Sequence, residues 1–135
     1  MVLTSQQICT ELLQLMERLK RDILELAEEH GLTRMQLFAL HSIDRQGEVA
    51  MGQVADLLGC DASNVTGIVD RLVAHGLVER HEGPHDRRTK KLSLTPKGHE
   101  LLEAISQLLP ERLGCSKLSQ AECEALHQII QKVAT

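Results

Sequence analysis

The sequence predicts a mainly α-helical fold with one small β-hairpin, built as a single domain of 135 residues. Apolar residues recur at helical spacing over most of the chain, and two short segments with strand-like alternation flank a turn-rich stretch near residue 85. The chain has 42% hydrophobic and 25% charged residues, which is enough apolar material for a core of its own. No apolar run approaches the ~20 residues that a membrane span needs. We therefore expect one folded domain with no membrane partner.

The first predicted helix opens at Thr4-x-x-Gln7, the pattern of a capping box, and continues to Gly31. Its apolar residues form two adjacent stripes, Ile8, Leu12, Leu15, Leu19, Ile23 and Leu26 beside Cys9, Leu13 and Met16. A stripe of this width predicts burial on two sides, against the protein's own core and against a partner.

A second capping box, Thr33-x-x-Gln36, predicts the next helix. Its residues expected to face inward are Leu37, Leu40 and Ile43. Two short helices follow, separated by Gly59; the second starts after an Asp61 cap and ends at Gly76, where glycine permits the left-handed turn. The apolar residues of this helix pair are Val54, Leu57, Leu58, Val65, Ile68, Val69, Leu72 and Val73.

Residues 77–81 and 91–94 alternate like two strands, and the turn-rich segment 82–89 joins them into a hairpin. Thr95-Pro96 then predicts a helix start, because threonine caps and proline suits the first turn. This helix carries Leu101, Leu102, Ile105, Leu108 and Leu109. Ser119-x-x-Glu122 predicts the cap of the last helix, which is lined by Leu126, Ile129, Ile130 and Val133.

The net charge of −4 hides a strong local asymmetry. Residues 1–30 carry three basic and six acidic side chains, whereas residues 80–97 carry six basic and two acidic ones, a local balance of +4. A concentrated basic segment is compatible with nucleic acid as a partner even in an acidic chain. The aromatic content, one Phe and no Tyr or Trp, argues against RNA recognition by base stacking.

Ala55, Gly59 and Val65 have the spacing of a helix-turn-helix, in which a small residue lets the helices approach, glycine makes the turn and a branched residue holds the second helix. The basic hairpin directly after it favours a winged helix that binds DNA. The second helix would enter the major groove with its N-terminus first, so that its short polar residues reach base edges or phosphates. These residues are Ser63, Asn64 and Thr66.

The chain resembles the MarR family of winged-helix regulators. The matching motifs are Val54-Ala55-Asp56-Leu57-Leu58, Asn64-Val65-Thr66-x-x-Val69-Asp70-Arg71-Leu72, Gly76-Leu77-Val78-x-Arg80, and Asp86-Arg87-Arg88 followed by Leu92-x-Leu94-Thr95-x-x-Gly98. The resemblance implies an obligate homodimer that binds pseudo-palindromic double-stranded DNA and is released by a small ligand or an oxidant. It places dimerisation helices at about residues 1–30 and 99–135 and the winged helix at about residues 33–98. The broad apolar stripes of the terminal helices favour the same dimer.

The hairpin tip and the adjoining positions complete the expected DNA interface. Many relatives place an arginine where this chain has Gly67, which leaves more of the binding to the wing. Arg71 is interpreted as a phosphate contact or an internal salt-bridge residue. The wing residues are Asp86, expected to pair with a wing arginine and shape the hairpin, and Arg87, Arg88 and Lys90, with Arg88 favoured for the minor groove.

Four cysteines without a CxxC pair or a secretion signal indicate reduced thiols and a cytoplasmic protein without a structural zinc site. Cys9 and Cys115 can be read as small buried hydrophobes. They also resemble the peroxidatic and resolving thiols of the organic-peroxide-sensing branch of the family, which would form a disulfide between subunits. Sensors of that branch use tyrosine hydroxyls to activate the thiolate, and this chain has none. Cys60 and Cys123 are expected to pack internally.

No metal site and no cofactor are predicted, because the histidines clustered around the wing lie on different kinds of element: His75, His81, His85 and His99. No enzyme is predicted either, since the chain lacks a phosphate loop, a nucleophile elbow and an HExxH motif. An aliphatic ligand pocket between the dimer helices and the winged helix stays open as an expectation from the resemblance. The alternative function is a winged-helix module that binds proteins rather than DNA.

Overall fold

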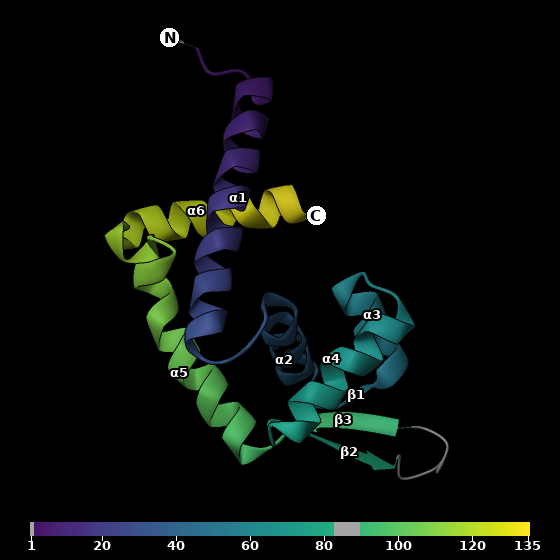
Figure 1. Ribbon diagram of the computed structural model, residues 1–135. Helices are drawn as coiled ribbons and strands as arrows, with labels where there is room; N and C mark the ends of the chain where they lie inside the picture. The colour runs from purple at the N-terminus through teal and green to yellow at the C-terminus, as the bar shows by residue number, and fades with distance from the viewer. Residues whose placement is uncertain (1, 83–89) are drawn as a thin grey trace. The chain divides into compact units, whose positions relative to one another are not determined.

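The structure is a computed structural model that describes residues 2–82 and 90–135, with the backbone alone at Ala62 and Ser63. Within these ranges the chain is mainly helical with one small antiparallel sheet (Figure 1), as predicted. The elements are α1 (Ser5–Glu29), α2 (Arg34–Gln46), β1 (Val49–Ala50), α3 (Met51–Leu58), α4 (Ala62–Ala74), β2 (Val78–Glu82), β3 (Lys90–Leu94), α5 (Pro96–Arg112), the 3-10 helix η1 (Cys115–Lys117) and α6 (Gln120–Ala134). Internal contacts divide the chain into two compact units, residues 24–105 and residues 1–23 with 106–135.

The three predicted capping boxes are confirmed. The Thr4 and Thr33 amides donate to the side-chain oxygens of Gln7 and Gln36 at 2.8 and 3.0 Å. The Ser119 amide donates to Glu122 at 2.9 Å, and the Glu122 amide donates back to the Ser119 hydroxyl at 3.1 Å. Donation from the Ser119 amide, and secondarily from its hydroxyl, lowers the pKa of Glu122.

The predicted cap at Asp61 is only half right. Asp61 does precede the first residue of α4 in extended backbone, with φ −67° and ψ 149°. Its side chain, however, makes no capping hydrogen bond in the described part of the chain. The start of α4 therefore lacks the side-chain capping bond found at the starts of α1, α2 and α6.

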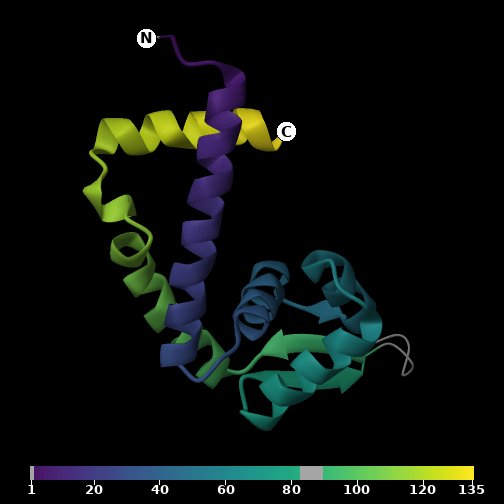
Figure 2. The same ribbon diagram turned by 45° about the horizontal axis from the view of Figure 1, so that its top comes forward.

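The sheet has the strand order β1-β3-β2, with both pairs antiparallel. The hairpin of β2 and β3 was predicted, and its register places Val78 opposite Leu94 and Glu82 opposite Lys90. Strand β1 was not predicted; its Val49 pairs with Leu92 of the central strand. In Figure 2 the sheet lies beside α4 and α2, which contact β2 and β3 respectively.

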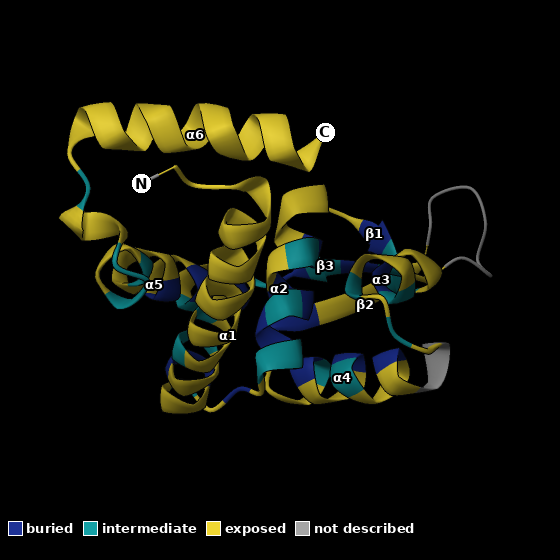
Figure 3. Cartoon of the chain, turned by 90° about the horizontal axis from the view of Figure 1, so that it is seen from above, coloured by how far each residue is buried: buried dark blue, intermediate teal, exposed yellow. Residues whose placement is uncertain are grey.

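The core of the unit formed by residues 24–105 is aliphatic and draws on every layer of that unit (Figure 3). Its fully buried large side chains are Leu26, Leu40, Ile43, Val49, Val54, Val65, Val69, Leu72, Val78, Leu92 and Ile105. Burial of Leu37, Leu40 and Ile43 confirms the inward face predicted for α2. Leu57 of α3 differs from its neighbours, because 48% of it is exposed.

The start of α5 is fastened to the connection between α4 and β2. The Thr95 amide donates to the Leu77 carbonyl at 3.1 Å, and the Thr95 hydroxyl donates to the Gly76 carbonyl at 2.6 Å. The Gly98 amide in turn donates to the Thr95 hydroxyl oxygen at 3.1 Å. Gly98 is buried, and the backbone of Leu77 occupies the space where a Cβ would stand. We call this arrangement the α5 clamp.

The other unit contains the first part of α1, the end of α5, η1 and α6. Arg18 joins two of these segments, because its guanidinium donates to the Leu113 carbonyl at 2.8 Å and lies 3.7 Å from Asp22. All fifteen residues of α6 are exposed, as Figure 3 shows in yellow. The terminal helices therefore present apolar side chains that this unit does not bury on its own.

Candidate nucleic-acid interface

Helices α3 and α4 form the predicted helix-turn-helix. Gly59 ends α3 in the left-handed region, with φ 64°, where glycine carries no steric penalty. The Cys60 amide donates to the Ala55 carbonyl at 3.2 Å, which closes the turn. Val54 and Val65 are buried at 0% and 1% exposure and anchor the two helices in the core. The sequence pattern located this motif correctly.

The outward face of α4 carries several of the predicted DNA contacts. Asn64, Thr66, Gly67 and Arg71 are exposed, while the side chain of Ser63 lies outside the described residues. Arg71 makes no salt bridge to any side chain in the described ranges. Both roles expected for Arg71 stay predictions.

A groove of about 270 Å³ separates this face of α4 from the first turn of α2. It is lined by Thr33, Gln36, Asn64, Gly67, Ile68 and Arg71. A Cβ added to Gly67 would meet nothing within 4 Å, so the groove is open at that position. The structure thus brings Asn64 and Arg71 together on one accessible surface, next to the start of a second helix. Sequence reasoning had not placed Thr33 beside them.

The hairpin positions the predicted wing. Strand β2 ends at Glu82 and β3 begins opposite it at Lys90, whose side chain is exposed. The tip residues Asp86, Arg87 and Arg88 lie outside the described residues. Their roles in shaping the wing and contacting DNA therefore stay predictions, although the strands that carry the tip are as expected.

An ion pair that the sequence reasoning did not assign ties α4 to the sheet. The Arg80 guanidinium of β2 pairs with the Asp70 carboxylate of α4. Both residues are partly exposed, so the pair adds little stability, on the order of 0–1 kcal/mol. The pair joins α4 directly to the hairpin strand that leads to the predicted wing. In the sequence, the only indication of this ion pair is that α4 and the strand after it carry residues of opposite charge, Asp70 and Arg80.

The four cysteines are free thiols, and the structure corrects part of their expected placement. Cys123 is exposed on α6 rather than buried, and Cys60 is only half-buried in the turn before α4. Cys9 and Cys115 are both exposed, so neither is a buried hydrophobe of this chain. The reason is common to the three exposed thiols: they lie in the unit of the terminal helices, whose apolar side chains are largely uncovered.

Two of the histidines around the wing, His81 and His99, each pair with neighbouring side chains, and His85 lies outside the described residues. His81 lies 3.2 Å from the Ser93 hydroxyl and 3.6 Å from Glu48, and His99 lies 3.3 Å from Asp44. Across residues 2–82 and 90–135, no group of three His, Cys, Asp or Glu side chains is placed to hold a metal ion. In the same ranges no helix is both long and apolar enough to cross a membrane.

Comparisons with known proteins agree with this geometry. The sequence model described as MarR family matches residues 30–89. The transcriptional repressor MprA of Escherichia coli (strain K12) is 32% identical over 116 residues, which cover 81% of this chain and 64% of that protein. The chain thus spans less than two thirds of the length of this relative.

Two solved structures resemble all or nearly all of the chain. The apo form of wild-type MarR from E. coli superposes with a TM-score of 0.79 at 25% identity, covering 100% of this chain and 99% of that one. A mutant MarR from E. coli complexed with operator DNA gives a TM-score of 0.72 at 25% identity, with 95% and 94% covered. The similarity therefore extends to a protein of this fold that was solved on DNA.

Proposed function

This chain belongs to the MarR family, and on that premise we propose that it is a cytoplasmic transcriptional repressor that binds promoter DNA as a homodimer. The observation that carries the proposal is the exposed face of α4, where Asn64 and Arg71 border an open groove within an intact helix-turn-helix. Short polar and cationic side chains on such a face suit base edges and phosphates in the major groove.

The terminal helices supply the proposed dimer surface. Their large apolar side chains are 40% to 70% exposed, and they are Ile8, Leu12, Leu13, Leu15 and Met16 of α1 and Leu126, Ile129, Ile130 and Val133 of α6. Exposed apolar surface of this extent is typical of an interface. A two-fold dimer would present two copies of α4 about one DNA turn apart, which fits a pseudo-palindromic operator.

The decisive test is selection of genomic fragments by the purified protein, followed by affinity measurements on a selected fragment at rising salt. Each phosphate contact releases counterions, so the logarithm of the association constant is expected to fall linearly with the logarithm of salt, by about 0.9 per phosphate. Enrichment of promoter fragments with two-fold related half-sites would support the repressor. If no fragment is enriched at low salt, the chain is instead the winged-helix module that binds proteins.

Replacing Arg88 with alanine is expected to weaken operator binding by about 1–3 kcal/mol, mainly through AT-rich flanking positions. The reason is that a wing arginine is attracted to the narrow, strongly negative minor groove of such sequences. Anisotropy titrations on operators with AT-rich and GC-rich flanks measure the effect. Arg21→Ala, at an exposed position of α1, is the matched control. The placement of Arg88 in the minor groove would be refuted if Arg88→Ala and Arg21→Ala lost the same DNA affinity. It would also be refuted if the affinity lost by Arg88→Ala were the same on AT-rich and GC-rich flanks.

The same proposal includes release of the repressor from DNA, either by a small ligand or by oxidation of cysteine. In the oxidative route the Cys9 thiolate attacks an organic hydroperoxide, giving a sulfenic acid and an alcohol. The thiol of the partner's Cys115 then displaces water and forms an intersubunit disulfide. Exposure of both thiols in this chain supports access to the oxidant.

One equivalent of hydroperoxide is accordingly expected to convert the protein into a covalent dimer on non-reducing gels, and to lower DNA affinity. Cys9→Ser should stay monomeric on the gel, and Cys123→Ser, another exposed thiol, should behave as the unmodified protein. Mass spectra that show neither Cys9 nor Cys115 modified would leave ligand release as the mechanism.

A further inference from the structure

Among the described residues, one salt bridge joins α4 to the hairpin, and its partners are Asp70 of α4 and Arg80 of β2. Neither side chain forms a second salt bridge in the described ranges. Both elements belong to the unit formed by residues 24–105, in which α4 packs against β2. The pair therefore links the helix proposed to enter the major groove with the strand that leads to the wing.

Arg80 lies on the face of the sheet that packs against the core. Side chains alternate along a strand, so Arg80 shares its face with Val78, and it stands opposite Leu92 of β3. Val78 and Leu92 are buried at 2% and 0% exposure, whereas the side chain of Arg80 is 35% exposed. A cation thus stands where an apolar residue would continue the buried face of β2. Its guanidinium reaches the carboxylate of Asp70 on α4.

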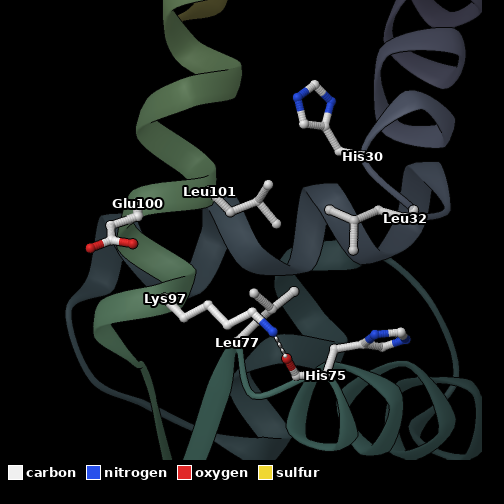
Figure 4. Close-up of a pocket in the computed structure, with 8 residues that line it drawn as sticks. His30, Leu32, His75, Leu77, Lys97, Glu100 and Leu101 are labelled. Atoms are coloured by element: carbon white, nitrogen blue, oxygen red, sulfur yellow. Dashed lines mark hydrogen bonds between the residues drawn. The ribbon is translucent and has the colours of Figure 1, made fainter.

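The C-terminal end of α4 is already fastened close to the start of β2. His75 follows Ala74, the last residue of α4, and its carbonyl accepts a hydrogen bond from Lys97 Nζ at 2.9 Å (Figure 4). A fastening at one end of a helix leaves the helix free to rotate about that point. Asp70 lies four residues before Ala74, about 6 Å along the helix axis. Its ion pair with Arg80 therefore supplies a second fastening, one turn away from the first.

The apolar underside of α4 does not supply the same restraint. Val65, Val69 and Leu72 bury α4 against the core, but apolar burial is non-directional. A charge-assisted hydrogen bond from a guanidinium to a carboxylate has a defined geometry. The pair also neutralises Asp70, whose side chain is 55% exposed on α4. An unpaired carboxylate on a helix that faces DNA would repel the phosphates.

We propose that Asp70 and Arg80 are positioning residues for DNA binding, whose ion pair holds α4 and the hairpin in the relative orientation in which both contact one operator half-site. The inference rests on the proposed function. Its distinguishing consequence is a sign. Replacing Asp70 by asparagine removes a negative charge from a helix that faces DNA, which by electrostatics alone would strengthen binding. Loss of the positioning contact instead weakens it.

Anisotropy titrations on a selected operator compare Asp70→Asn, Arg80→Gln and the variant that carries both changes. Each single variant is expected to bind about fivefold more weakly, and the double variant also about fivefold rather than twenty-fivefold, because both changes remove the same interaction. Melting temperatures should change little, since a partly exposed pair adds little stability. Tighter binding by Asp70→Asn, or losses that add in the double variant, would overturn the proposal.

The matched control is Asp22→Asn. It removes the same charge and breaks another ion pair, with Arg18 at 3.7 Å, in the unit that does not contain α4 or the hairpin. Its operator affinity is expected to equal that of the unmodified protein. A loss for Asp22→Asn as large as that for Asp70→Asn would show that the position of the pair does not matter, and would overturn the inference.

Two further measurements separate positioning from a general loss of structure. Combining Asp70→Arg with Arg80→Asp restores opposite charges, so this variant should bind the operator more tightly than either of its single parents. In the protein without DNA, amide residual dipolar couplings report the orientation of α4 relative to β2 and β3, which should change in Asp70→Asn. An unchanged orientation would overturn the inference. If the unmodified protein selects no DNA, the proposed function fails, while these couplings still test the positioning.

Discussion

Replacing Gly98 with alanine is expected to lower the free energy of unfolding by about 3 kcal/mol, near the upper end of overpacking effects. An alanine Cβ at this position would overlap the Leu77 carbonyl oxygen and stand 3.1 Å from its carbonyl carbon and 3.3 Å from Leu94 Cγ. A backbone carbonyl cannot rotate away as a side chain can. The oxygen also accepts the Thr95 amide hydrogen bond, so relief of the overlap would loosen the α5 clamp.

The matched control is Gly67→Ala. Gly67 lies inside α4, and a Cβ there would meet nothing within 4 Å, so this variant should gain about 0.5–1 kcal/mol from helix propensity. Urea unfolding followed by circular dichroism measures the free energy of unfolding of both variants. The dependence of this free energy on urea concentration is compared between the variants to check that unfolding stays two-state. If both variants changed stability in the same direction and by the same amount, the close approach of α5 to Leu77 would not be a determinant of the fold.

Replacing Ile130 with aspartate is expected to convert the proposed dimer into monomers and to lower operator affinity at least ~100-fold. Ile130 is 52% exposed on the apolar face of α6, where burial of a carboxylate at an interface would be costly. A monomer engages one half-site, and loss of the second, linked contact removes an avidity of roughly 10²–10⁴.

The matched control is Gln128→Asp, which introduces the same charge on the opposite face of α6. This variant should leave the dimer and the operator affinity unchanged. Sedimentation measures the oligomeric state, and anisotropy measures DNA affinity. A monomeric Ile130→Asp protein with undiminished affinity would contradict the need for a dimer. A dimeric Ile130→Asp protein would instead show that α6 lies outside the interface.

Local patterns explain why so much of the fold could be predicted. Thr4, Thr33 and Ser119 each satisfy backbone donors with a partner three residues away, so the signal is contained within four residues. The hairpin could also be predicted locally, because every second residue from Leu92 of β3 is apolar and buried and a turn-rich segment precedes the strand; in β2 only Val78 is buried. Gly59 marked the turn of the helix-turn-helix through the left-handed conformation it adopts.

The features that were not predicted depend mostly on contacts between residues far apart in the sequence. Strand β1 is two residues long, too short for alternation, and exists only because Val49 finds Leu92 some forty residues later. The Asp70–Arg80 pair and the groove beside Thr33 likewise depend on which elements meet. Cys123 was misplaced for another reason: an apolar stripe predicts burial without saying whether the chain itself or a partner provides it.

The strand order β1-β3-β2 also bears on solubility. It leaves β2 with one unpaired edge, a row of peptide groups that could recruit strands from other molecules. Four of its five residues are ionisable: Glu79, Arg80, His81 and Glu82. Stacking two such edges would bring charged side chains close together and strip them of water. The charged residues of β2, the strand that leads to the wing, therefore disfavour edge-to-edge aggregation of the protein.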